Sequence, residues 1–317
     1  MKAVLIDSEQ QLRWSDVADP AWKAGYVLIQ VKAAGVNRAD LLQVAGKYPP
    51  PQGWPEWPGL ECAGVVVKAG ADSRWKAGDQ VCALLGGGGY AEKVLVPEGM
   101  VLPIPRGISF IEAACLPEVY TTAMLNLVRL GELRRGETVF VQAGASGLGI
   151  AAIQIAKLLG AKVVTTVGSE EKAAAVRKIG ADVVINRKAE PVEEILMKNP
   201  IDVALDCAGG AIMGKCLNAM NPGGRWILVA TLGGETTEIP LRIMLKNHLR
   251  LMGSTLRSRS DAEKSEILKQ VMELLWPQVE NGSVRPMINQ VFQMKDASEA
   301  HQVLAQQKNI GKVVLVL

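Results

Sequence analysis

A strand, a glycine-rich turn and a helix follow one another directly near the middle of the chain. Residues 138–149 read TVFVQAGASGLG, and residues 150–157 continue as IAAIQIAK with helical spacing. Backbone amides at the start of such a helix bind a pyrophosphate, and the helix dipole adds to the attraction. In a G-x-G-x-x-G alignment, the residues expected at the phosphates are Gly144, Ser146, Gly147, Leu148 and Gly149. A tight turn that serves only the fold is the alternative, but the flanking strand and helix favour a dinucleotide site.

Ser146 stands where the second glycine of this pattern normally lets a phosphate approach the backbone. Its side chain adds a Cβ atom and a hydroxyl group. We therefore expect a pyrophosphate that either sits slightly further out or exchanges a hydrogen bond with the hydroxyl.

The second part of the chain alternates between strand-like and helical stretches. We expect strands at residues 138–142, 162–167, 181–185, 203–207 and 225–229, and helices at residues 147–159 and 170–179. Repeating β-α units predict a parallel sheet with helices on both faces, the doubly wound Rossmann architecture. A further helix is expected at residues 261–275.

The first 120 residues are instead rich in glycine, proline and short β-like runs, at residues 26–33, 62–68 and 90–96. Turn signals separate these runs and predict a compact, irregular β-barrel. The last run, residues 312–317, is expected to return to this barrel without a helical partner. The predicted fold is α/β, with residues 1–120 and 261–317 in the barrel domain and residues 121–260 in the Rossmann domain.

Composition limits the classes of function. The 317 residues suffice for two domains, and a net charge of +3 is too small to predict nucleic acid or membrane as the main partner. No apolar run approaches the roughly 20 residues of a membrane helix, and the first ten residues lack the features of a secretory signal, so we expect a cytoplasmic protein. The five cysteines contain no CxxC and predict buried free thiols. Two histidines make a zinc site or a histidine-based triad hard to build.

The end of the second predicted Rossmann strand indicates the cofactor. NAD sites place Asp or Glu about 20 residues after the glycine loop, whereas this strand ends in Gly168 and Ser169, with Lys172 and Arg187 nearby. Hydroxyl and cationic groups suit a 2′-phosphate, so we expect NADPH. Two observations leave alternatives open. The acidic residues 170 and 171 could turn toward a ribose, and the two cations could be solvated surface charges.

Several segments together resemble the quinone oxidoreductases of the medium-chain dehydrogenase/reductase superfamily. They are AGVNRAD at 34–40, GKYPP at 46–50, PGLECAG at 58–64, the glycine loop, GSEEK at 168–172 and NIGK at 309–312. The branch that they resemble most is the quinone reductases induced by a tumour suppressor in animals, with zeta-crystallin more distant. The resemblance implies a GroES-like catalytic domain, an inserted Rossmann domain, a cleft between them and a homodimer.

The same resemblance implies an enzyme without zinc. Zinc-dependent relatives carry a cysteine in the segment that matches residues 35–40 and a histidine in a Gly-His-Glu motif. This chain has Asn37 near the first place and Leu60 at the second, and it lacks the four-cysteine lobe. Because leucine cannot ligate a metal, we expect no catalytic zinc. Without zinc, a quinone or an activated alkene is a better substrate than an alcohol.

Tyr48 is the first candidate for a catalytic side chain. The matching family position lies at the cleft, and related enoyl reductases carry a functional tyrosine there. Reduction of a quinone or an enone needs orientation and a donor for the developing oxyanion. The alternative is a loop tyrosine packed against Pro49 and Pro50.

The resemblance also implies residues around the nicotinamide. Asn37 is expected as a catalytic and nicotinamide-side polar group, with a turn residue as the alternative. Thr122 resembles a threonine that lies against the nicotinamide, with a helix cap as the alternative. Asn309 resembles a C-terminal residue that closes over the cofactor. The ends of the last Rossmann strands are expected to contribute Ala230, Leu232, Ser254 and Leu256, which on the residues alone are structural.

Three functions follow. The leading hypothesis is NADPH:quinone reduction, with hydride passing to a quinone in the interdomain cleft and Tyr48 orienting or protonating the product. The second is reduction of a 2-enoyl thioester or an enone, with Tyr48 as proton donor. The third is an NADPH-binding protein with a structural or regulatory role, as zeta-crystallins suggest.

Overall fold

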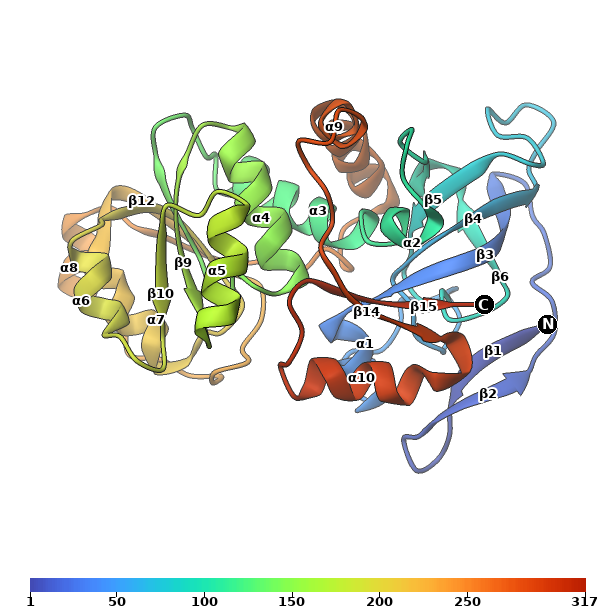
Figure 1. Cartoon of the computed structure of the whole chain (residues 1–317), viewed down its shortest axis with the longest axis horizontal. Helices are drawn as coiled ribbons and strands as arrows, with labels where there is room; N and C mark the ends of the chain where they lie inside the picture. Colours follow the sequence, from blue (N-terminus) through green and yellow to red (C-terminus); the bar gives the residue numbers. More distant parts are fainter. The chain divides into compact units, whose positions relative to one another are not determined.

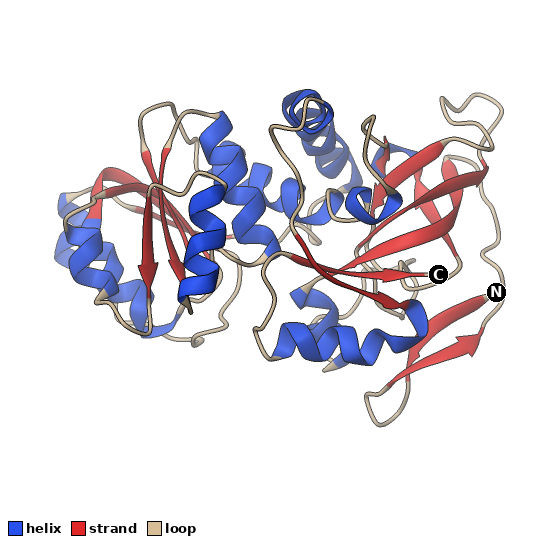
Figure 2. Cartoon of the chain, viewed as in Figure 1, coloured by secondary structure: helices blue, strands red, loops and turns tan.

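The computed structural model describes residues 1–317, which form two compact units. Unit 1 consists of Met1–Thr121 and Arg257–Leu317, and unit 2 consists of Thr122–Leu256. Each unit contains a large sheet with helices against it (Figure 2).

Unit 2 is built on six parallel strands in the order β10-β9-β8-β11-β12-β13. The chain runs outward from β8 to β10, then returns beside β8 and runs outward again, which is the doubly wound order. This confirms the predicted Rossmann sheet. The strands are β8 (Thr138–Val141), β9 (Lys162–Val167), β10 (Val183–Asn186), β11 (Ile201–Asp206), β12 (Met220–Leu228) and β13 (Arg250–Gly253).

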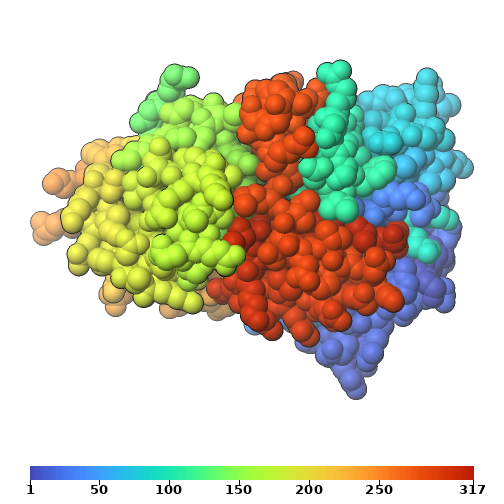
Figure 3. Space-filling model, viewed as in Figure 1, coloured from blue at the N-terminus to red at the C-terminus, as the bar shows by residue number.

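Helices cover both faces of this sheet. In Figure 1, α4 and α5 lie on one face, and α6, α7 and α8 lie on the other. In Figure 3 the green and yellow-green side chains of the α4 and α5 region form a continuous surface on that side. The helices are α4 (Gly147–Leu158), α5 (Glu170–Lys178), α6 (Val192–Met197), α7 (Gly210–Cys216) and α8 (Leu241–Lys246).

The core of unit 2 includes a contact between two aromatic rings. Phe140 and Trp226 are fully buried, and their ring centroids lie 6.1 Å apart. The surrounding core includes apolar side chains from α6 and α7, such as Leu196 and Met213. The indole Nε1 of Trp226 donates to Asp206 Oδ2 at 3.0 Å, so the one polar atom of this ring is satisfied.

Unit 1 contains a seven-stranded sheet and a two-stranded sheet. The longest strand, β3, pairs with β4 and also with β6 and β15, so it holds the unit together. The strands are β1 (Lys2–Ile6), β2 (Leu12–Asp16), β3 (Tyr26–Val36), β4 (Glu61–Lys68), β5 (Gln80–Leu84), β6 (Lys93–Pro97), β7 (Val101–Pro103), β14 (Ile288–Gln293) and β15 (Lys312–Val316). The helices are α1 (Arg38–Val44), α2 (Phe110–Ala113), α3 (Pro117–Ala123), α9 (Asp261–Glu280) and α10 (Ala297–Ala305), and the end of α3 belongs to unit 2.

The C-terminal segment returns to unit 1, as expected, but not as a strand without a helix. β15 pairs with β3, and it also pairs in parallel with β14, to which α10 connects it (Figure 1). The prediction that the last strand lacks a helical partner is therefore wrong. The sequence of β14, INQVFQ, is half polar and mostly solvent-exposed, so it gave no signal of a buried strand.

Two further expectations need correction. Helix α9 runs to Glu280, past Pro277, whereas the sequence predicted its end at residue 275. The indole of Trp276 donates to Pro103 O at 2.8 Å and anchors this last stretch. All five cysteines are free, but Cys207 is only partly buried.

None of the helices is long and apolar enough to cross a membrane.

Candidate functional site

Most of the residues predicted to bind the cofactor lie at one edge of the unit 2 sheet. Because the strands are parallel, their carboxyl ends meet at the same edge, where ligands of doubly wound sheets bind. The glycine loop follows β8, Gly168 follows β9 and Arg187 follows β10. Beyond β12 and β13 lie Ala230, Leu232, Ser254 and Leu256.

The glycine loop is shaped by close approach of the backbone. A Cβ atom at Gly144 would lie 2.1 Å from Thr165 Oγ1, and one at Gly149 would lie 2.4 Å from Ala143 O. Ser146 caps α4, because its hydroxyl accepts from Gly149 N at 3.0 Å. Gly147 and Leu148 are the first two residues of α4, where backbone amides have no partner within the helix. Amides at such a helix N-terminus fit an anionic pyrophosphate.

Ser146 does more than replace a glycine. Its oxygen already accepts one hydrogen bond in the cap, whereas its proton remains available for a phosphate oxygen. The sequence left two expectations for Ser146, a pyrophosphate that sits further out or one that exchanges a hydrogen bond with the hydroxyl. The second expectation fits this geometry.

Two cations lie beside the turn after β9. The guanidinium nitrogens of Arg187 lie 3.2 and 3.3 Å from the place where a Cβ atom of Gly168 would be. Ser169 caps α5 and accepts from Lys172 N at 3.3 Å. Burial lowers the pKa of Lys172, and the nearby charge of Arg187 lowers it further. The structure therefore keeps two mutually repelling cations close together, which suits a dianionic phosphate.

The acidic neighbours of this turn are engaged differently. Glu170 Oε1 accepts from Asn186 Nδ2 at 2.8 Å, which ties it to the end of β10. Glu171 is exposed and acts on Lys172 by raising its pKa. No acidic side chain ends β9, since this strand stops at Val167.

The far strands contribute mostly backbone at the same edge. Leu232 is 49% exposed, and its amide donates to Cys207 O at 3.3 Å. The amide of Ser254 donates to Leu228 O, but its buried hydroxyl has no partner. Leu256 is buried. These residues lie along the carboxyl edge of the unit 2 sheet and bring no charged side chain to it.

Thr122 lies inside a helix rather than at a helix start. It belongs to α3, which continues into a π-helical stretch at Met124–Leu130. The carbonyl of Thr122 accepts from Asn126 Nδ2 at 2.6 Å. The helix-cap alternative is therefore wrong, whereas a role beside the nicotinamide stays a prediction. π-Helical turns occur often at functional sites.

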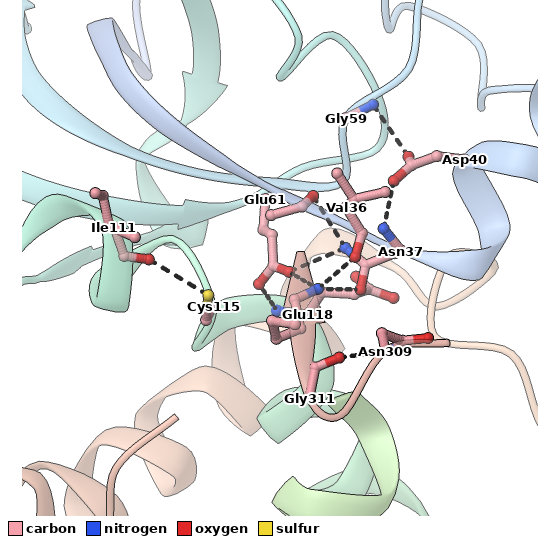
Figure 4. A network of polar contacts seen from close by, with 12 residues as sticks. Val36, Asn37, Asp40, Gly59, Glu61, Ile111, Cys115, Glu118, Asn309 and Gly311 are labelled. Carbon is pink, nitrogen blue, oxygen red and sulfur yellow. Dashed lines mark hydrogen bonds and ion pairs between the residues drawn. The ribbon is translucent and has the colours of Figure 1, made fainter. Parts of the chain in front are cut away.

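Unit 1 contains a buried ionic cluster around Asn37 (Figure 4). The ammonium group of Lys312 contacts Glu61 Oε1 at 2.6 Å, Asn37 Oδ1 at 2.6 Å and Val36 O at 2.8 Å. Asn37 Nδ2 donates to the same Glu61 oxygen at 2.9 Å. Both ends of the Asn37 amide are thus occupied within unit 1. This side chain holds the cluster together, and its role toward the nicotinamide stays a prediction.

A second buried group adjoins this cluster. Asp40 accepts hydrogen bonds from the amides of Asn37 and Gly59 and from the Tyr90 hydroxyl. Burial raises the pKa of the Asp40 carboxyl to about 6, despite these hydrogen bonds. His301 Nε2 lies 3.2 Å from the Tyr90 oxygen, and burial lowers the pKa of this histidine to about 4.

Tyr48 lies on a loop of unit 1 and packs against a cation rather than only against its neighbouring prolines. The guanidinium carbon of Arg257 lies 4.1 Å from the centroid of the Tyr48 ring. Burial raises the pKa of Tyr48, the charge of Arg257 lowers it, and Glu118 raises it. Burial also raises the pKa of Glu118 to about 8. Burial and the charges of Arg257 and Glu118 thus act together on the pKa of the Tyr48 phenol.

Asn309 lies in the turn that precedes β15. Its Nδ2 atom donates to Gly311 O at 2.7 Å, which closes a turn directly before β15 (Figure 4). Closure of this residue over a cofactor stays a prediction.

The sequence did not single out Glu61, Lys312, Glu118 or Arg257. Glu61 and Lys312 stand in quoted motifs, and their available signal was a charged residue directly next to an apolar run. Glu118 and Arg257 lie outside those motifs. Leu60, at the place where the resemblance implies a histidine in zinc-dependent relatives, is 2% exposed and belongs to the core. No group of three or more His, Cys, Asp or Glu side chains is arranged to hold a metal ion.

Known proteins with the same architecture define the family. The model of the alcohol dehydrogenase GroES-like domain matches residues 23–106, and that of the zinc-binding dehydrogenase family matches residues 147–276. The quinone oxidoreductase of Mus musculus is 32% identical over 312 residues, which cover 96% of this chain and 92% of the relative. The chain belongs to the medium-chain dehydrogenase/reductase family. It is an oxidoreductase of this family, with a GroES-like unit 1 and a Rossmann unit 2.

Solved structures of this family are similar over the whole chain. The quinone oxidoreductase of Thermus thermophilus, also determined in complex with NADPH, has a TM-score of 0.86 and 31% identity, with 100% of both chains covered. The CurK enoyl reductase has a TM-score of 0.85 and 25% identity, covering 99% of this chain and 98% of the other. The cofactor class of this medium-chain dehydrogenase/reductase, a nicotinamide dinucleotide, fits the carboxyl edge of unit 2.

Proposed function

We propose that this protein reduces quinones with NADPH and without a metal ion. The observation that carries the cofactor choice is the pair of cations, Lys172 and Arg187, beside Gly168 at the end of β9. An acid at this place would repel a 2′-phosphate, and β9 ends without one. The likeness to the quinone oxidoreductases of Mus musculus and Thermus thermophilus supports the choice of acceptor.

We assign separate roles to the residues that would bind the cofactor and to those that would act on the acceptor. The amides of Gly147 and Leu148 and the hydroxyl of Ser146 hold the pyrophosphate, and the two cations hold the 2′-phosphate. When bound, NADPH supplies the hydride. Tyr48 orients the acceptor and gives a proton to the reduced product. Leu60, at the place of a metal-binding histidine in relatives, supports chemistry without zinc.

The acceptor is tested by comparing two electrophiles. We expect NADPH oxidation with 1,2-naphthoquinone to be faster than with crotonyl thioester, measured as kcat/KM. Faster turnover of the thioester would overturn the quinone assignment. Dialysis against a strong chelator should leave the quinone rate unchanged, and a loss that zinc restores would contradict metal-free chemistry.

Reduction of an enone or a 2-enoyl thioester is the second candidate. It is favoured by the likeness to the CurK enoyl reductase and by the phenol of Tyr48 beside Arg257. Protonation of a carbanion requires more acid assistance than protonation of a quinone product. Tyr48→Phe should therefore lower turnover of an enone more than turnover of a quinone.

We also propose a cytosolic homodimer. Five free cysteines suit a reducing compartment. β13 ends the unit 2 sheet, and the neighbouring helix α8 exposes Leu241 and Leu245 at 67% and 76%. Exposed apolar side chains beside a sheet edge support an interface between two copies. Light scattering should give about twice the chain mass, and a monomer at micromolar concentration would contradict this.

A further inference from the structure

Arg257 holds the loop that carries Tyr48. One of its terminal nitrogens donates to Tyr48 O at 2.8 Å and to Pro49 O at 3.0 Å. The other donates to Gln43 Oε1 at 3.0 Å, on helix α1. The side chain therefore connects the loop to α1 while its guanidinium lies on the Tyr48 ring.

The charge of Arg257 has no anionic hydrogen-bond partner. All three of its acceptors are neutral oxygens, two carbonyls and one amide. Its Nε atom is buried and has no hydrogen-bond partner at all. Burial lowers the pKa of Arg257, which reflects an unfavourable position for a cation. A part-buried charge without an anionic hydrogen-bond partner reduces stability, so a role purely in holding the loop does not account for it.

The groups that face the two side chains also come from unit 1. Glu118 acts on both Tyr48 and Arg257, and Asp40 acts on Arg257. Glu118 is protonated over much of the neutral range, because burial raises its pKa to about 8. In that state it does not neutralise Arg257. Among the charged groups that raise the pKa of Arg257, Tyr48 has the largest effect, ahead of Asp40.

We propose that Arg257 is a positioning residue for Tyr48, which it fixes by its loop carbonyl and whose oxygen it stabilises as an anion during proton transfer. The proton step is balanced. After hydride addition, the O–H bond of Tyr48 breaks, the proton bonds to the reduced acceptor, and the electron pair stays on the phenolate oxygen. Solvent water returns a proton afterwards. The choice of acceptor rests on the proposed function, but the effect of Arg257 on Tyr48 does not.

Spectrophotometric titration tests this effect without any substrate. The chain has four tyrosines, so subtracting the curve of Tyr48→Phe isolates the Tyr48 phenol. In Arg257→Met we expect the Tyr48 ionisation constant to fall about tenfold, because a positive charge beside the ring is lost. Arg257→Lys keeps the charge and should show a smaller shift. An unchanged Tyr48 titration in Arg257→Met overturns the proposal, and if that variant does not fold, an unchanged titration in the neutral variant Arg257→Gln does so.

Kinetics with an enone separate positioning from loop support. We expect Arg257→Met to lower kcat about tenfold, and adding it to Tyr48→Phe to cause no further loss. A raised KM with unchanged kcat, or a further loss in the double variant, would mean that Arg257 only supports the loop. Lys23→Met is the matched control, since Lys23 lies over another ring, Tyr26, at 3.9 Å. If no acceptor is turned over, the proposed function fails while the titration still decides the role of Arg257.

Discussion

Replacing Lys172 by alanine removes one of the two cations beside Gly168, and we expect it to weaken NADPH binding specifically. A hydrogen bond to a charged group contributes about 1.5–3 kcal/mol, whereas a fully exposed ion pair contributes less than about 1 kcal/mol. Lys172 is part-buried, and Arg187 remains beside it. We therefore expect a loss of about 2 kcal/mol, which is roughly a thirtyfold rise in the Kd of NADPH. NADH lacks the 2′-phosphate, so its Kd should change less than about twofold.

Fluorescence titration or calorimetry at two ionic strengths measures these affinities. The effect should shrink from low salt to about 0.5 M salt, because charges near the surface are screened. Lys178→Ala is the matched control on the same helix, about 9 Å further along its axis. Since burial and Arg187 lower the pKa of Lys172, NADPH affinity should fall with rising pH earlier than for an ordinary lysine. Equal losses for NADPH and NADH would refute the 2′-phosphate assignment.

Three further variants test the packing around the candidate site. Lys312→Met leaves Glu61 buried without its cation, so urea denaturation should show a loss of about 3–5 kcal/mol, and unchanged stability would contradict the pairing. Burial lowers the pKa of His301 from 6.5 to about 4, so the unfolded chain takes up the proton first as the pH falls. Stability of the wild type should therefore fall by about 3 kcal/mol more than that of His301→Gln between pH 6.5 and 4, whereas parallel curves would refute this. Gly144→Ala places a Cβ atom 2.1 Å from Thr165 Oγ1 and should reduce stability by about 1–3 kcal/mol. Adding Thr165→Ala to this variant should recover most of the loss, whereas purely additive effects of the two substitutions would exclude this clash as the cause.

The Rossmann unit could be predicted because its signals are local. The strand Lys162–Val167 is a continuous apolar and β-branched run, which is typical of a buried parallel strand. The glycine loop joins a strand directly to a helix, so its place at the sheet edge follows from chain order. By contrast, β14 and α10 are amphipathic or polar and gain their structure from packing beside β15. The sequence of β14 alone does not distinguish it from a surface loop.

The residues of the candidate site also differ in whether local sequence could predict their places. Ser146, Ser169 and Lys172 are close in sequence to the turns that they serve, so their places could be predicted. The partners of Tyr48 could not, because Arg257 lies 209 positions further along the chain. The same holds for Lys312, whose contact with Asn37 Oδ1 spans 275 positions. Long-range pairs of this kind depend on the tertiary fold, and one sequence contains no local pattern for them.

The central claim is that this oxidoreductase uses NADPH to reduce quinones. The most direct test is the initial rate of 1,2-naphthoquinone reduction by the wild-type protein with NADPH and with NADH, each well below its KM. We expect a kcat/KM at least about tenfold higher with NADPH, because only this cofactor carries the 2′-phosphate that we assign to Lys172 and Arg187. Equal values with both cofactors, or no quinone reduction with either, would contradict it.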